Sequence, residues 1–121
     1  MKHALFALLL SGCALLAPAK YDPLEFVSYA EIWQWAQRLE ESCGDTRGEF
    51  RAVFGMRLAL ERLVLAARFG PDEGSRKLAV GMAGVVEAVR AGGSSAYCGE
   101  AAQNVRAAAE RSMQAVGGRA R

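Results

Sequence analysis

Apolar side chains recur every three or four residues in four stretches of this chain, and that spacing predicts four amphipathic helices. The first begins at Asp22-Pro23-Leu24-Glu25, where an aspartate cap, a first-turn proline and a glutamate are typical of a helix start. Gly44 is expected to end it. Its expected buried face consists of Leu24, Ile32, Trp35, Ala36, Leu39 and Cys43.

The second helix is expected to open with the capping box formed by Thr46 and Glu49 and to stop at Gly70-Pro71. Gly55 in its interior costs about 1 kcal/mol relative to alanine, so it marks either a close helix crossing or a bend. The expected apolar stripe consists of Phe50, Val53, Phe54, Leu60, Val64 and Ala67. One side carries Arg47, Arg51 and Arg62, as a solvated face or as a site for an acidic partner.

The third helix is expected from about Ser75 to Gly92-Gly93, and the fourth from Ser94 or Ser95 to Gly117-Gly118. Their apolar positions are Leu78, Met82, Val85 and Val89, and then Cys98, Ala102, Val105, Ala109, Met113 and Val116. Gly81, Gly84 and Ala88 give the third helix a thin side that another backbone can approach, within the bundle or in a partner. No stretch alternates with the period of a strand. The sequence therefore predicts an all-α, up-down four-helix bundle over residues 22–117, with a tail at 118–121.

The N-terminus has the pattern of a secretory signal, with a positive start at Met1-Lys2-His3 and an apolar run from Ala4 to Leu10. The following Leu10-Ser11-Gly12-Cys13 resembles the lipobox of bacterial lipoproteins. That resemblance implies a cleaved signal peptide at 1–12, a lipid on Cys13, and a short tether at 13–21.

Two other interpretations of this segment remain open. Ala17-Pro18-Ala19 would suit an ordinary signal-peptidase site, with Lys20 starting the mature chain. A membrane anchor from Ala4 to Ala17 would be short, because a spanning helix needs about 20 apolar residues.

The lipobox resemblance also implies a location in the cell envelope. The acyl chains of a mature lipoprotein attach it stably to a membrane. Ala14 follows the cysteine, which in enteric-type sorting implies the outer membrane, with the domain facing the periplasm. The inner membrane stays open, because other bacteria use different sorting residues.

With Cys13 assigned to the lipid, Cys43 and Cys98 form an even pair in an exported chain, and such a pair predicts a disulfide. The alternative is two buried free thiols. In an up-down bundle the end of the first helix and the start of the fourth lie at the same end, so the two cysteines can meet.

Composition limits the chemistry. The chain has 121 residues, enough for one domain, and its net charge of +2 lacks the strong basic balance of a nucleic-acid binder. The single histidine, His3, lies in the predicted signal peptide, so the mature domain has no imidazole for catalysis or metal binding. Glu40 and Glu41 point about 100° apart on a helix and make a poor acid–base pair. We therefore predict no enzymatic activity, cofactor, metal or small-molecule substrate.

Phe26, Tyr29 and Trp33 are spaced by three and four residues, which gathers them beside the core face of the first helix. Such an aromatic strip could receive the amphipathic helix of a partner. The alternative is that a wide core face includes all three.

The order of lipobox, first helix ending in Cys43, two further helices, and Cys98 opening the last helix resembles the helical pilotins of type II secretion. The resemblance implies a disulfide between Cys43 and Cys98, and a role in binding a C-terminal secretin helix and escorting it to the outer membrane. The sequence thus predicts an adaptor for an envelope protein. The alternatives are a phage- or plasmid-encoded exclusion or immunity lipoprotein that blocks a receptor or channel, and a structural lipoprotein that binds peptidoglycan.

Overall fold

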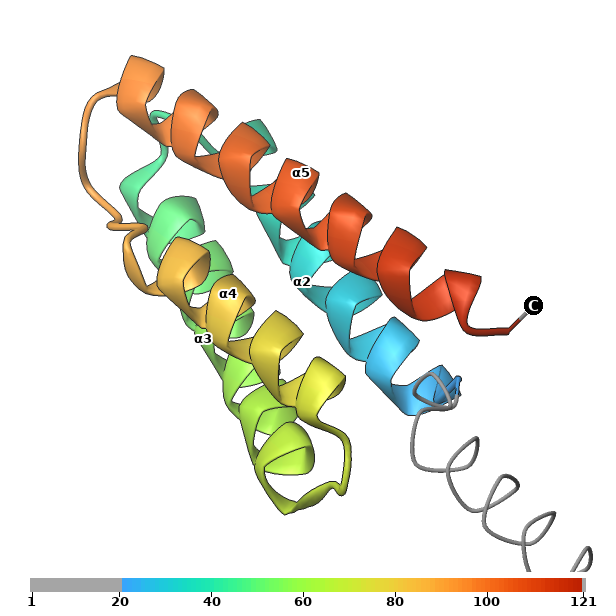
Figure 1. The fold of residues 1–121 in the computed structure, drawn as a ribbon. Helices are drawn as coiled ribbons and strands as arrows, with labels where there is room; N and C mark the ends of the chain where they lie inside the picture. Colours follow the sequence, from blue (N-terminus) through green and yellow to red (C-terminus); the bar gives the residue numbers. More distant parts are fainter. Residues whose placement is uncertain (1–20, 121) are drawn as a thin grey trace, which may run out of the picture.

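The computed structural model describes residues 21–120, which form an all-α four-helix bundle (Figure 1). Residues 1–20, with the predicted signal peptide and Cys13, lie outside the described residues, as does Arg121. The helices are α2 (Pro23–Glu41), α3 (Thr46–Phe69), α4 (Glu73–Glu87) and α5 (Ser95–Gly118). Contacts join α2 to α3 and α5, and α4 to α3 and α5, so α3 lies diagonally across the bundle from α5. The predicted bundle is confirmed.

Side-chain caps explain where three helices begin. The carboxylate of Asp22 accepts a hydrogen bond from Leu24 N at 3.0 Å, as predicted, and Ser94 Oγ, one of the two serines expected as a cap, accepts one from Tyr97 N at 3.1 Å. Asp72 caps α4 in the same way, which places its start two residues before Ser75. This helix also ends at Glu87, before the predicted glycine pair. The predicted capping box of Thr46 and Glu49 is wrong, because Asp45 precedes α3 without a side-chain cap and the Glu49 carboxylate accepts from two other backbone amides.

The core confirms most expected positions on α2 and α5, but it differs on α3. The α3 residues that pack inward are Ala52, Val53, Met56, Ala59, Leu60 and Leu63. Phe50 and Phe54, expected in the core, lie on the outer surface, and Phe54 is 65% exposed. Leu24 on α2 is likewise 76% exposed. The placement of these three residues in the core was wrong. On α3 the buried face is the one that carries the small residues Ala52 and Ala59, and Leu24 lies in the first turn of α2, before the first fully buried residue, Tyr29.

Gly55 lies where α3 crosses α2 closely. A Cβ built at this glycine would overlap the indole ring of Trp35, and the Arg38 guanidinium stacks on that ring at 4.6 Å from its centre. Of the two expectations for Gly55, the structure therefore shows the close crossing.

We expect Gly55→Ala to lower the free energy of unfolding by about 1–2 kcal/mol, because the overlap with Trp35 outweighs the better helix propensity of alanine. Gly84→Ala is the matched control on α4, since its Cβ would meet no atom within 4 Å. That variant should gain about 0.5–1 kcal/mol. Urea unfolding followed by circular dichroism measures both, and equal gains would show that the crossing tolerates a methyl group.

One end of the bundle is stabilised by a disulfide bond and by the buried carboxylate of Glu49. Cys43 and Cys98 form a disulfide with a Cα–Cα distance of 5.7 Å, joining α2 to α5. Glu49 on α3 is 3% exposed, and its two oxygens accept from Gly44 N at 3.1 Å and Gly92 N at 3.3 Å. Both glycines have positive φ, at 96° and 84°, a conformation that side chains disfavour. Glu49 thus ties together the two connections at this end.

The opposite end is closed by polar side chains from α2, α4 and the C-terminal segment. Arg119 Nη1 donates to Glu25 Oε2 at 3.0 Å and to Ser75 Oγ at 3.2 Å. Ser75 Oγ also donates to the Glu25 carboxylate at 2.9 Å. Arg119, which we expected in a tail, is therefore held within the domain.

Candidate functional site

The predicted aromatic strip does not form an open groove, because Tyr29 is fully buried. Its hydroxyl has no hydrogen-bond partner among the described residues. Burial raises the pKa of the Tyr29 hydroxyl well above its ordinary value, and the nearby Glu25 carboxylate adds to the shift. Tyr29 is a core residue in this structure.

The other two members of the strip are half-buried and face α5. A Cβ at Gly117 would lie 3.6 Å from the Phe26 ring, and Trp33 Nε1 donates to Glu110 Oε1 at 2.9 Å. Both rings pack against the core. Phe26 and Trp33 therefore help to join α2 to α5, in agreement with the alternative that a wide core face includes them.

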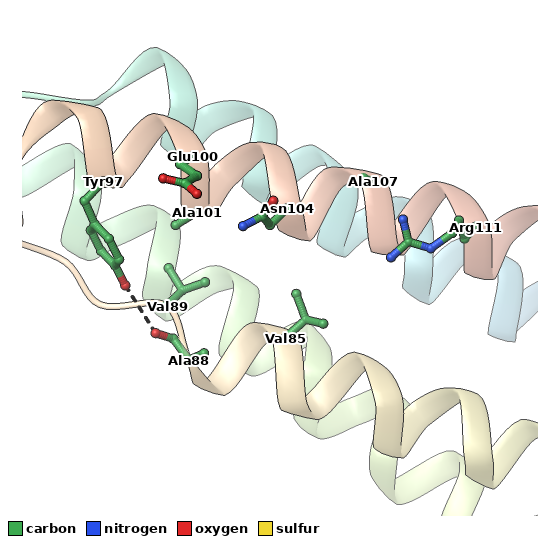
Figure 2. A pocket seen from close by; sticks show the side chains of 9 residues that line it. All are labelled: Val85, Ala88, Val89, Tyr97, Glu100, Ala101, Asn104, Ala107 and Arg111. Carbon is green, nitrogen blue, oxygen red and sulfur yellow. Dashed lines mark hydrogen bonds between the residues drawn. The ribbon is translucent and has the colours of Figure 1, made fainter.

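Helices α4 and α5 lie next to each other in the bundle and contact each other less than the other neighbouring pairs of helices do (Figure 1). Two hollows of about 500 and 260 Å³ follow one another along this pair of helices and share Val85 and Arg111 in their linings. We call them together the α4–α5 groove. Figure 2 shows Val85 of α4 and Val89, two residues beyond the end of α4, projecting toward α5 across the larger hollow.

The groove has an apolar lining and polar residues along α5. Its apolar residues are Leu78, Gly81, Met82, Val85, Ala88, Val89, Ala101, Ala107 and Ala108. On α5, Glu100, Asn104, Ala107 and Arg111 line the larger hollow at successive intervals of four, three and four residues, so they share one helical face (Figure 2). Lys77 on α4 adds a second positive charge to the smaller hollow.

Hydrogen bonds close the groove at both ends and leave its middle open. At one end the Tyr97 hydroxyl donates to Ala88 O at 3.2 Å and accepts from Arg90 N at 3.2 Å. At the other end, the Arg119 contact with Ser75 joins the end of α5 to the start of α4. The two helices are thus held apart at a fixed spacing.

The thin side of α4 faces the open side of the bundle. A Cβ at Gly81 or Gly84 would meet no atom within 4 Å, and Ala88 is also exposed. The close approach that we expected within the bundle therefore does not occur at these glycines. Gly81 lies in the groove, where a docked chain would reach the α4 backbone without meeting a side chain.

Sequence reasoning did not identify the groove residues, although the α5 sequence contains a signal for them. The polar positions Glu100, Asn104 and Arg111 follow a helical line directly beside the apolar seam that contains Cys98 and Val105. Such a line is typical of an ordinary solvated face, and only the separation of α4 from α5 makes it the wall of a groove.

Within residues 21–120, no three histidine, cysteine, aspartate or glutamate side chains gather in a way that would hold a metal ion. None of the four described helices is both long enough and apolar enough to cross a membrane. No protein-family model, curated protein or solved structure matches this chain.

Proposed function

We propose that this protein is a lipid-anchored, periplasm-facing lipoprotein that binds an amphipathic helix of an envelope protein in the α4–α5 groove. The observation that carries the proposal is the groove itself, with its apolar lining and its polar line along α5. The lipobox-like Leu10-Ser11-Gly12-Cys13 supports the anchor and the location at the outer membrane. The protein acts as an adaptor without catalysis.

The shape of the groove suits a helix. It runs beside the 15 residues of α4, which span about 22 Å, or four helical turns. Small residues on both walls, such as Gly81 and Ala107, allow a third helix to approach at the usual packing distance of about 8–10 Å. The apolar face of such a helix would lie against Val85 and Ala88, with polar side chains reaching Asn104 and Arg111.

The more specific form of the proposal is a pilotin-like escort of a secretin. It is supported by the lipobox, by the similar order of helices, and by the disulfide between Cys43 and Cys98 at the positions that the resemblance implies. In this form the groove takes the C-terminal helix of the secretin subunit.

Site-specific photocrosslinking in the native host tests the groove. A photoreactive residue at Ala107, which lines the groove, should yield an adduct with one envelope protein. The same residue at Gln34, exposed on α2 and away from the groove, should not. Mass spectrometry of the adduct should locate the crosslink in an amphipathic helix, and the identity of the protein decides whether it is a secretin. Equal adducts from both positions would contradict the groove assignment.

Filling the groove should block binding without unfolding the domain. In Ala107→Trp a large ring occupies the space between α4 and α5, and we expect at least a tenfold loss in co-purification of the crosslinked partner. Gln34→Trp is the control on the exposed side of α2 and should bind normally. Unchanged binding by Ala107→Trp, with an unchanged melting temperature, would refute the proposal.

A further inference from the structure

The outer face of α3 carries an apolar stripe along almost its whole length. The residues of this α3 stripe are all exposed, and they are Phe50, Phe54, Leu58, Leu65 and Phe69. At about 100° per residue they fall within an arc of roughly 100°. Phe69, at the end of the helix, is 83% exposed. Single exposed apolar residues are ordinary, but a stripe with three phenylalanines, interrupted between Leu58 and Leu65 by the exposed Glu61 and Arg62, is large enough to mark an interaction surface.

Positive charge surrounds the α3 stripe. The helix contains five arginines, Arg47, Arg51, Arg57, Arg62 and Arg68, against two glutamates, Glu49 and Glu61. Glu49 is buried, so Glu61 is the single exposed acid on this helix. Among the described residues, Arg47, Arg51 and Arg68 form no ion pair, whereas Arg62 contacts Glu31 of α2 at 2.6 Å.

The apolar surface continues onto the start of α2. Leu24 and Val27 are exposed, and their spacing places them on the same side of α2 as Glu31. Because Glu31 reaches Arg62, this side of α2 adjoins the outer face of α3. The apolar surface is therefore widest at the end where Leu65 and Phe69 lie, which is also where the chain enters the domain from the predicted tether.

We infer that this α2–α3 face lies on the anionic surface of a lipid bilayer. Its apolar side chains would sit at the boundary between headgroups and acyl chains, with the unpaired arginines on the lipid phosphates. A second copy of the same face is a poor occupant, because a symmetric contact would bring two sets of arginines together. The inference goes beyond the proposed function, since it requires neither the lipid on Cys13 nor a partner in the groove.

Vesicle sedimentation tests the inference with residues 20–121, produced with the disulfide intact. Every fully buried core residue lies between Tyr29 and Val116, so this segment contains all of the described packing. We expect it to bind vesicles of phosphatidylethanolamine and phosphatidylglycerol, and to bind pure phosphatidylcholine vesicles at least tenfold more weakly. Binding to the anionic vesicles should fall as salt is added.

Two sets of variants distinguish vesicle binding through the α2–α3 face from binding that depends only on the net charge of the domain. Phe54→Gln with Phe69→Gln should weaken vesicle binding at least tenfold, because both rings lie in the α3 stripe. Arg51→Gln should weaken it about fivefold, the effect of about 1 kcal/mol per arginine near an anionic surface. Arg111→Gln removes the same charge from the opposite side of the bundle and should have little effect.

Three results would overturn the inference. They are an absence of binding to anionic vesicles, equal losses for Arg51→Gln and Arg111→Gln, and a dimer in analytical ultracentrifugation that Phe54→Gln dissociates while vesicle binding is absent. Ala107→Trp should leave vesicle binding unchanged, so a failure of the groove proposal remains distinct from a failure of this one.

Discussion

Removing the disulfide with Cys43→Ala and Cys98→Ala is expected to lower the free energy of unfolding by about 4 kcal/mol. The bond joins residues 55 positions apart, and a loop of that length substantially restricts the unfolded chain. A domain of this size has a total stability of about 5–15 kcal/mol, so the variant should lose a large share of it. Alanine is the better replacement, because Cys98 is buried and a serine hydroxyl there would add a separate cost.

Urea unfolding of the variant and of the oxidised wild-type protein measures this difference. The wild-type protein unfolded in the presence of a thiol reductant is the control, because it loses the bond while keeping both sulfur atoms. The urea concentration at the unfolding midpoint of the reduced wild-type protein should be close to that of the variant. An unchanged unfolding midpoint after reduction would mean that the bond adds nothing to the stability of the bundle.

Glu49→Ala is expected to cost about 3 kcal/mol. The variant removes the acceptors for Gly44 N and Gly92 N, and an unsatisfied buried donor costs about 1–3 kcal/mol. Glu49→Gln keeps one acceptor oxygen and should cost about half as much, while Glu61→Ala on the exposed side of α3 should cost little.

Hydrogen exchange locates the effect. In Glu49→Ala the Gly44 and Gly92 amides should exchange faster than the rest of the domain, because the variant releases the two connections that Glu49 joins. A uniform increase at all amides, with no local opening at the glycines, would mean that Glu49 contributes to the general stability of α3 and not to the connections.

The sequence predicted the elements well because their local signals agree with the fold. The caps at Asp22 and Ser94 are visible in the sequence as polar residues directly before an apolar repeat, and the structure has both. The Cys43–Cys98 pairing was predicted from the even pair that remains once Cys13 is assigned to the lipid, it agrees with the up-down order of the helices, and it is also present. Such features depend on neighbouring residues or on chain order alone.

The buried face of α3 was predicted less well, because this helix has two apolar faces. Phe50 and Phe54 are more hydrophobic than Ala52 and Ala59, so pattern reasoning placed the phenylalanines inside. The close crossing at Gly55 requires small neighbours, and it turns the other face outward. Which of two apolar faces is buried depends on the shape of the partner helix, and a single sequence does not contain that information.

The candidate site depended on the same kind of tertiary information. The spacing of the aromatic residues on α2 is visible in the sequence, but Tyr29 is fully buried in the core and not on an open surface. The α4–α5 groove arises because the Tyr97 and Arg119 contacts hold the ends of α4 and α5 while the middle stays apart. Neither the Tyr97 contact nor the Arg119 contact is visible as a sequence motif, because each links residues from different elements.

The order of helices around the bundle decides whether the two proposed surfaces compete. Because α2 and α3 form one side and α4 and α5 the other, a domain resting on lipid through its α2–α3 face would present the α4–α5 groove to the aqueous compartment. The domain would then bind its partner in a fixed orientation while diffusing only in the plane of the membrane. Confinement to the membrane raises the effective concentration of the binding groove near any protein in the same membrane. A groove with low affinity for its partner would therefore still be occupied.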